Sequence, residues 1–239
     1  MPPASFVRRF RWPILVALLV LGVAVVAPFV YINLIKEDAA ERPTLDDVIT
    51  TTTGGDGSST TAGGSTDGID GTWTITNGSV VQYRVTEVLL GQDAEATGVA
   101  DGVTGTAEIS GTTVTAVDVE VDMTTFESPE SRRDGQFQGR IMETDEFPTA
   151  TFTLTEPVDL VAVPADGERI TIQATGELTM HGVTQVVTFE LTAALNGSTF
   201  AAEAAIPITF SDYDIDDPSG GPATVGDEGT LEVLLVFGR

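Results

Sequence analysis

From Thr72 to the C-terminus, apolar and polar residues alternate with a period of two. The clearest stretch runs from Val117 to Met123, where every odd-numbered residue is apolar and every even-numbered residue is acidic. This pattern predicts strands with one buried face and one face in water, as in an antiparallel sheet. Comparable runs predict further strands at residues 80–88, 149–155, 169–179, 184–195, 200–208 and 230–237.

Turn signals separate several of these runs. Ser110-Gly111 and Asn196-Gly197 lie between strand candidates, and Asn-Gly is a strong hairpin signal because both residues accept the left-handed backbone of a tight turn. About eight strands at short spacing predict an all-β fold, either a barrel or a sandwich.

One segment breaks the strand pattern. Serine suits the N-cap of a helix, proline its first position and an acid its first turn, and Ser128, Pro129 and Glu130 follow in that order. We therefore expect a short helix or helical loop from Pro129 to about Gly139. The segment carries several polar and aromatic side chains: Arg132, Arg133, Asp134 and Phe137. Its arginines either pair with nearby acids or form a polar rim around a ligand mouth.

A long apolar run lies near the N-terminus. The nineteen residues from Ile14 to Ile32 carry no formal charge, and three arginines lie between residues 8 and 11. About 20 apolar residues in a helix cross a bilayer, and the preceding positive charges keep the N-terminus in the cytoplasm. We expect a cytoplasmic stub at 1–12, a single transmembrane helix at 13–35 and everything beyond it outside the cell membrane. A cleaved signal peptide is the alternative, although its apolar region is usually only about 7–15 residues long.

Residues 36–70 have the composition of a flexible linker, rich in Thr, Gly, Ser and Asp. As a disordered coil this linker would span roughly 30 Å. Residues 71–239 then form one domain, large enough for a core of its own. The absence of cysteine excludes disulfides and a lipoprotein anchor.

The chain is strongly acidic, with a formal net charge of −25. Beyond residue 70 its only basic residues are six arginines and one histidine. Such a domain is repelled by phosphate backbones and by anionic lipid headgroups, so we expect no nucleic-acid partner. Nothing in the pattern specifies an oligomer.

Motifs for catalysis are absent, and we expect no enzyme. The sequence lacks a nucleophile elbow, a phosphate-binding loop, a dinucleotide fingerprint and a zinc signature. His181 is the only histidine, and its place in a turn-like segment indicates a structural hydrogen-bonding role. Residues 211–221 contain spaced acids, but Asp217 and Ala223 occupy positions where a calcium loop needs glycine and glutamate. We expect no cofactor and no metal.

Aromatic and methionine residues gather around the expected helix, at Phe126, Phe137, Met142, Phe147 and Phe152. An eight-stranded barrel can enclose one small ligand, so these residues either line a cavity or belong to an ordinary core.

Four segments, in order, resemble the YceI-like domain family. Residues 73–85 resemble its opening strands, and Arg132-Arg133-Asp134 followed by residues 143–152 resemble its central segment. Residues 176–184, which include His181-Gly182, closely match its signature. The resemblance covers residues 71–239.

The resemblance implies a lipocalin-like antiparallel barrel that holds a polyisoprenoid or a similar lipid, such as a quinone. It places Arg133 and Asp134 near the mouth, His181 in the signature turn, and the aromatic cluster around the cavity. We therefore expect a membrane-tethered extracytoplasmic protein that sequesters an isoprenoid-type lipid. Residues 89–105 are richer in Gly and Ala than in many relatives, so a structural or envelope-interaction module with a filled core is the alternative.

Overall fold

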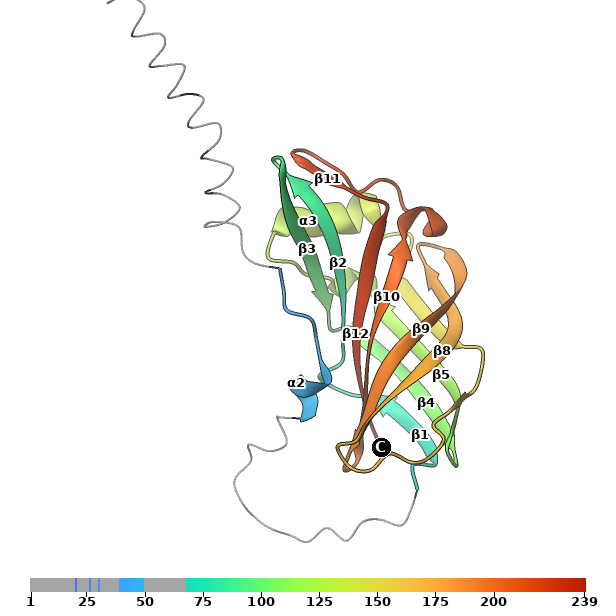
Figure 1. Ribbon diagram of the computed structural model, residues 1–239. Coiled ribbons are helices and arrows are strands. Elements are labelled where there is room, and N and C mark those ends of the chain that lie inside the picture. Colours follow the sequence, from blue (N-terminus) through green and yellow to red (C-terminus); the bar gives the residue numbers. More distant parts are fainter. Residues whose placement is uncertain (1–19, 21–25, 27–29, 31–38, 50–67) are drawn as a thin grey trace, which may run out of the picture.

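The computed structural model describes residues 20, 26, 30, 39–49 and 68–239 (Figure 1). Most of the expected transmembrane helix at 13–35 and of the expected linker at 36–70 therefore lies outside the described residues. Among those described, no helix combines the length and the apolar character that crossing a membrane requires.

Twelve strands form one connected sheet within the described residues. They are β1 (Gly71–Ile75), β2 (Val80–Leu89), β3 (Gln92–Ala100), β4 (Val103–Ser110), β5 (Thr113–Asp122), β6 (Thr149–Leu154), β7 (Val158–Asp159), β8 (Arg169–Met180), β9 (Val183–Asn196), β10 (Thr199–Thr209), β11 (Ala223–Val225) and β12 (Glu228–Gly238).

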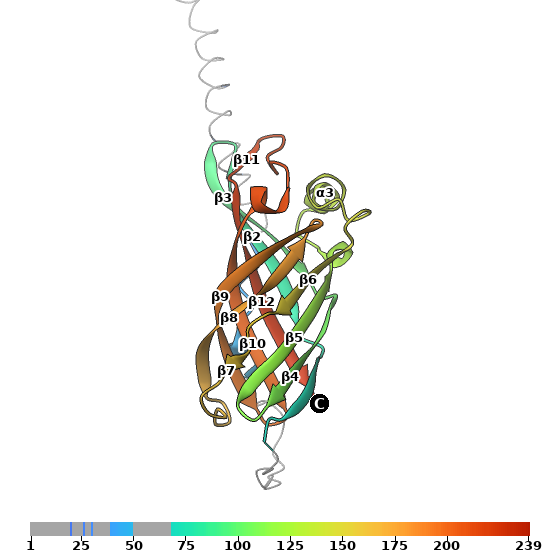
Figure 2. The ribbon, with the colours of Figure 1, turned by 90° about the vertical axis from the view of Figure 1, so that its right-hand side faces the viewer.

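Eight of these described strands close into an antiparallel barrel, in the order β1-β4-β5-β6-β8-β9-β10-β12, because β12 returns to pair with β1 (Figure 2). This confirms the all-β barrel that the sequence predicted. β2 continues the direction of β1, and β3 that of β4, so β2 and β3 form a hairpin that extends beyond one end of the barrel. β11 pairs with the edge of β2. We call this end the mouth and the opposite end, at the β9–β10 turn, the base.

The alternation of residues along the strands places the core inside the barrel. On β5, Val119 and Val121 are buried and the intervening Glu120 is exposed, as predicted. The buried aromatic and methionine side chains near the mouth pack into the same cluster: Met123, Phe126, Phe137, Met142 and Met180.

The helical insertion begins two residues later than predicted. Helix α3 spans Ser131–Gln136 and continues as a π-helical turn, η4 (Phe137–Ile141). Glu130, not Ser128, is the N-cap. Ser128 instead donates its backbone N–H and its hydroxyl to Oδ1 of Asp134, at 2.9 and 2.6 Å. Ser128 Oγ also accepts from the backbone N–H of Glu130 at 3.3 Å, so the bonds of Ser128 lie ahead of the helix, and the N-cap Glu130 makes no side-chain capping bond.

Residues 39–49, within the segment expected to be a linker, pack against the outer wall of the barrel. We call this segment the strap; it ends in the short helix α2 (Leu45–Ile49). Leu45 is fully buried in a small outer cluster with Ala194, Ala201, Leu234 and Val236. Figure 1 shows the strap, in blue, running from the level of β2 and β3 toward the base.

Candidate ligand cavity

The middle of the barrel contains an apolar cavity of about 150 Å³. Inward-facing residues of β5, β8, β10 and β12 form its wall, among them Val119, Ile172, Ala204 and Leu235. An apolar void of about 150 Å³ stays dry and takes a benzene-sized guest. By itself this inner cavity therefore holds only a few carbon atoms.

A second cavity, of about 290 Å³, lies above the inner one at the mouth. Its wall combines β2, the α3–η4 insertion and the loop that leads to β11. The two cavities have four wall residues in common: Met123, Phe126, Met180 and Leu231. They are therefore adjoining compartments of one barrel interior, separated by flexible methionine and leucine side chains and one phenylalanine.

Charged groups line the upper cavity, supplied mainly by β2 and the helical insertion: Glu87, Glu130, Arg132 and Arg133. Arg133 Nη2 lies 3.7 Å from Oε1 of the buried Glu87. Arg132 makes no hydrogen bond or ion pair with any residue that the structure describes. Its guanidinium is thus available to an anionic or strongly polar ligand group at the mouth.

Tyr83 lies between the apolar and the charged parts of the wall of the upper cavity. Its ring stacks on Phe137 at a centroid distance of 5.1 Å and contacts Phe126 at 5.7 Å. Burial raises the pKa of the Tyr83 hydroxyl to about 12. The hydroxyl therefore stays protonated and can donate a hydrogen bond near Arg133.

The third arginine of the insertion has a structural role. Arg140 donates to the backbone carbonyls of Asp217, Pro218 and Ser219, at 3.0 to 3.3 Å. It thereby fixes the acidic loop that forms one side of the upper cavity. Hydrogen bonds from Ser219 lower the pKa of Asp217. Within the described ranges, no group of three or more acidic or histidine side chains is placed to hold a metal ion.

Five of the eight residues expected at a lipid site line the two cavities: Phe126, Arg133, Phe137, Met142 and Phe152. The other three, Asp134, Phe147 and His181, are not among the wall residues. Whether the five bind lipid stays a prediction.

His181 connects three segments around the mouth. Its Nδ1 donates to the carbonyl of Tyr213 at 3.1 Å, and its Nε2 lies 3.2 Å from Oε2 of Glu143. The ring of Phe147 meets the imidazole edge-on at 4.7 Å. His181 itself has φ +51° in the β8–β9 turn. These contacts indicate that His181 has a structural role: it connects the β8–β9 turn to the segments of Tyr213 and Glu143.

Sequence reasoning missed Tyr83, Glu87 and Arg132 as wall residues. A signal for Tyr83 was present in β3, the strand opposite it, which carries Gly98 among several alanines. A Cβ added at Gly98 would lie 2.4 Å from the Tyr83 ring, so the glycine provides the space that the ring fills. Gly176 and Phe152 repeat this arrangement on the other side of the barrel, also at 2.4 Å.

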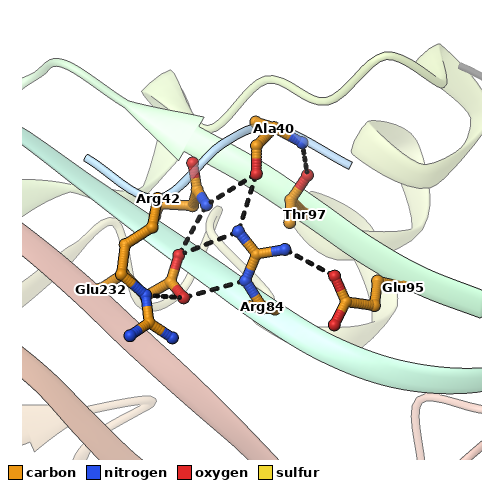
Figure 3. Close-up of polar contacts among 7 residues, drawn as sticks. Ala40, Arg42, Arg84, Glu95, Thr97 and Glu232 are labelled. Carbon is orange, nitrogen blue, oxygen red and sulfur yellow. Dashed lines mark hydrogen bonds and ion pairs between the residues drawn. The ribbon is translucent and has the colours of Figure 1, made fainter. Parts of the chain in front are cut away.

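A polar cluster lies on the outer wall beneath the strap (Figure 3). Glu232 of β12 points away from the cavities, yet it is fully buried. Its carboxylate accepts from Arg42 Nε at 2.8 Å, Arg84 Nε at 2.9 Å and Gln82 Nε2 at 2.7 Å. Burial raises the pKa of Glu232, but the hydrogen bonds and charges of Arg84 and Arg42 outweigh burial and leave it below its ordinary value. Glu232 is thus ionised at neutral pH and binds the strap to the barrel.

Comparison with known proteins gives the family and the fold. A family model described as YceI-like domain matches residues 69–237. Among solved structures, a polyisoprenoid binding domain from Saccharophagus degradans implicated in plant cell wall breakdown is 18% identical with a TM-score of 0.58, covering 70% of this chain and 98% of that chain. BcnA of Burkholderia cenocepacia is 20% identical with a TM-score of 0.53, covering 66% and 95% of the two chains.

The YCEI protein of Campylobacter jejuni is 14% identical with a TM-score of 0.50, covering 59% of this chain and 84% of that chain. At these identities the likeness is one of fold. No protein with a curated description matches the chain.

Proposed function

The chain belongs to the family of YceI-like domains, and from that premise we propose that it is a membrane-tethered extracytoplasmic protein that holds an isoprenoid-type lipid in its barrel. The observation that carries the proposal is the pair of adjoining cavities, apolar within and charged only toward the mouth. An amphiphile with an apolar chain and one polar end has the same distribution of polarity. The solved polyisoprenoid binding domain with the same fold adds support.

The lipid chain enters through the upper cavity and extends into the inner one. Met123 and Met180 lie between the compartments, and unbranched methionine side chains repack readily around a guest. Burial of the chain contributes roughly 25 cal/mol per Å² of apolar surface removed from water. Arg132 meets the polar end, a quinone carbonyl or a phosphate, at the mouth. The apolar run from Ile14 to Ile32 supplies the membrane tether and places the barrel outside.

The test compares two leucine substitutions on adjacent residues of β10. Ala204 lines the inner cavity, whereas the next residue, Ala205, faces outward and is exposed. The full chain and each variant are purified from membranes, and the isoprenoid extracted per mole of protein is quantified by mass spectrometry. We expect Ala204→Leu to fill the inner cavity and to lower bound isoprenoid about tenfold, a loss of about 1.4 kcal/mol. Ala205→Leu should retain the wild-type amount.

Equal amounts of lipid in both variants would contradict the placement of the lipid chain in the inner cavity, and no lipid in the wild type would contradict lipid binding and favour a structural module. A second comparison addresses the mouth. Arg132→Gln should weaken binding of geranylgeranyl phosphate several-fold and leave binding of geranylgeraniol unchanged, because only the phosphate pairs with the guanidinium.

A further inference from the structure

The strap fixes the point at which the chain reaches the barrel. The backbone N–H of Ala40 donates to Thr97 Oγ1 at 2.9 Å, and its carbonyl accepts from Arg84 Nη2 at 2.7 Å (Figure 3). Ala40 therefore lies beside the β2–β3 hairpin.

From Ala40 the strap runs toward the base. Five residues later Leu45 packs on Ala194 and Ala201, and Asp46 pairs with Arg169 at the start of β8. Followed backward, the same path leads from the base toward the turn of the β2–β3 hairpin (Figure 1). The described strap thus begins on the mouth side of Leu45.

The reach of the chain sets a limit on the distance to the membrane. Seven Cα–Cα steps join Ile32, the last residue of the apolar run, to Ala39, where the strap begins, and when extended they span at most about 25 Å. From Arg84 to the hairpin turn at Leu90, β2 covers about 20 Å, so the turn lies within that reach. Toward the base, β12 continues from Thr230, the partner of Arg84, to Gly238, which is about 26 Å. The hairpin turn is therefore nearer than the base to the start of the strap.

The hairpin turn presents apolar side chains to its surroundings. Val88 is 41% exposed and Leu90 is 44% exposed. Leu90 has φ +53°, a left-handed conformation in which leucine is strained and glycine or asparagine is usual. Its N–H donates to the carbonyl of Pro222, a wall residue of the upper cavity, at 3.1 Å. The apolar turn is thus joined directly to the mouth.

We propose that residues 88–91 form a bilayer-contact surface, and that the strap holds the mouth of the barrel against the membrane from which the lipid enters. This inference rests on the proposed membrane anchor and lipid binding. Asp93 lies opposite Val88 on the hairpin, so the turn sits at the level of the headgroups and not in the hydrocarbon core. The contact suits zwitterionic lipid, because the acidic domain is repelled by an anionic surface.

The experiment uses single cysteines, which are unambiguous because the chain has none. Leu90→Cys reports on the mouth and Val161→Cys on the base, where Val161 is 88% exposed beside the β5–β7 pair. Glu41→Cys reports on the strap side of the barrel. Each full-length variant is labelled with an environment-sensitive fluorophore and reconstituted into phosphatidylcholine vesicles that contain a nitroxide-labelled lipid. We expect quenching at position 90 to exceed quenching at 161 and 41 several-fold.

Strongest quenching at position 161 would mean that the base faces the bilayer, and strongest quenching at 41 that the barrel lies on its side. Either result, or equal quenching at all three positions, overturns the proposal. Two controls separate this failure from failure of the proposed function: flotation of the full chain with vesicles tests the anchor, and the isoprenoid extracted from Leu90→Cys tests the cavity. As support for the role of the strap, Glu232→Ala in the Leu90→Cys background should lower quenching at position 90.

Discussion

A single carboxylate on the outer wall determines whether the strap stays in place. Glu232 is fully buried although its side chain points away from the cavities, and Arg42 of the strap and Arg84 of β2 both pair with it. Buried charges are tolerated only when such partners are present.

We predict that Glu232→Ala destabilises the protein by about 3–5 kcal/mol, because Arg84 and Gln82 lose their shared acceptor under the strap. Urea denaturation gives the free energy of unfolding, and amide hydrogen exchange at Ala40 reports on strap release. Glu228→Ala on the same strand is the control, since its exposed side chain should change stability by no more than about 0.5 kcal/mol. Similar values for the two variants would contradict the role of Glu232.

The pKa of Glu232 also predicts a dependence on pH. Since the folded state lowers this pKa, the stabilisation is present above the ordinary glutamate value of about 4.3 and is lost as pH falls through the lower folded value. Glu232→Gln lacks the stabilisation at every pH. The difference in unfolding free energy between wild type and Glu232→Gln should therefore be largest near neutral pH and shrink on acidification below about pH 4. A difference that grows in acid would refute this assignment.

At the scale of elements, two glycines should respond in opposite directions to alanine. A Cβ at Gly98 in β3 would overlap the Tyr83 ring, so Gly98→Ala should destabilise the protein by about 1–3 kcal/mol. Gly135 in α3 has no neighbouring atoms within 4 Å of an added Cβ, so Gly135→Ala should stabilise it by about 0.5–1 kcal/mol. Thermal unfolding monitored by circular dichroism measures both, and a stabilising Gly98→Ala would show that the ring is free to move.

The elements that the sequence predicted are those with strong alternation. β8, β9, β10 and β12 follow their predicted ranges to within about two residues because each has one wet and one buried face, whereas β5 begins four residues before the predicted stretch at Val117. No strand was predicted from the residues that form β3, because small alanines and one glycine weaken the apolar alternation there, and Gly98 makes room for the Tyr83 ring on the neighbouring strand. The helix start was misplaced because Asp134, six residues away, engages the predicted cap, Ser128.

The strap shows that composition alone does not distinguish a flexible linker from a segment that packs on the barrel. Its composition is that of a linker, but Leu45 packs on the barrel and Arg42 pairs with the buried Glu232, and these partners are about 150–190 residues away in the sequence. Such long-range pairing leaves no local signal.

The candidate site was predicted only in part: Phe126, Phe137 and Arg133 line the cavities as expected, whereas Tyr83 was missed and Phe147 lies outside the walls. Arg132 and Arg133 are neighbours in sequence, yet Arg133 alone of the two pairs with Glu87, and the sequence does not show this difference.

At the scale of the whole molecule, the barrel interior links binding to stability. A ligand that binds only the folded state stabilises it by about 2.7 kcal/mol at one hundred times its dissociation constant. For a domain of this size each kcal/mol corresponds to roughly 2–4 °C. Geranylgeranyl phosphate at that concentration should therefore raise the Tm by about 5–10 °C, as measured by differential scanning calorimetry. A tenfold weaker affinity leaves Ala204→Leu with about 1.4 kcal/mol of this stabilisation, so its increase should be only about 3–6 °C, whereas Ala205→Leu should retain the full increase.

The strap has a consequence for shedding. Leu45, ahead of residues 50–67, packs on one wall of the barrel, and Ile69, after them, is buried beside Trp73 near the base. A protease that cut between residues 50 and 67 would sever the peptide link between strap and barrel, but the contacts of the strap would still hold the two fragments together. If the proposed anchor precedes the strap, the barrel would then stay at the membrane for the residence time of Leu45 and Arg42 on their partners.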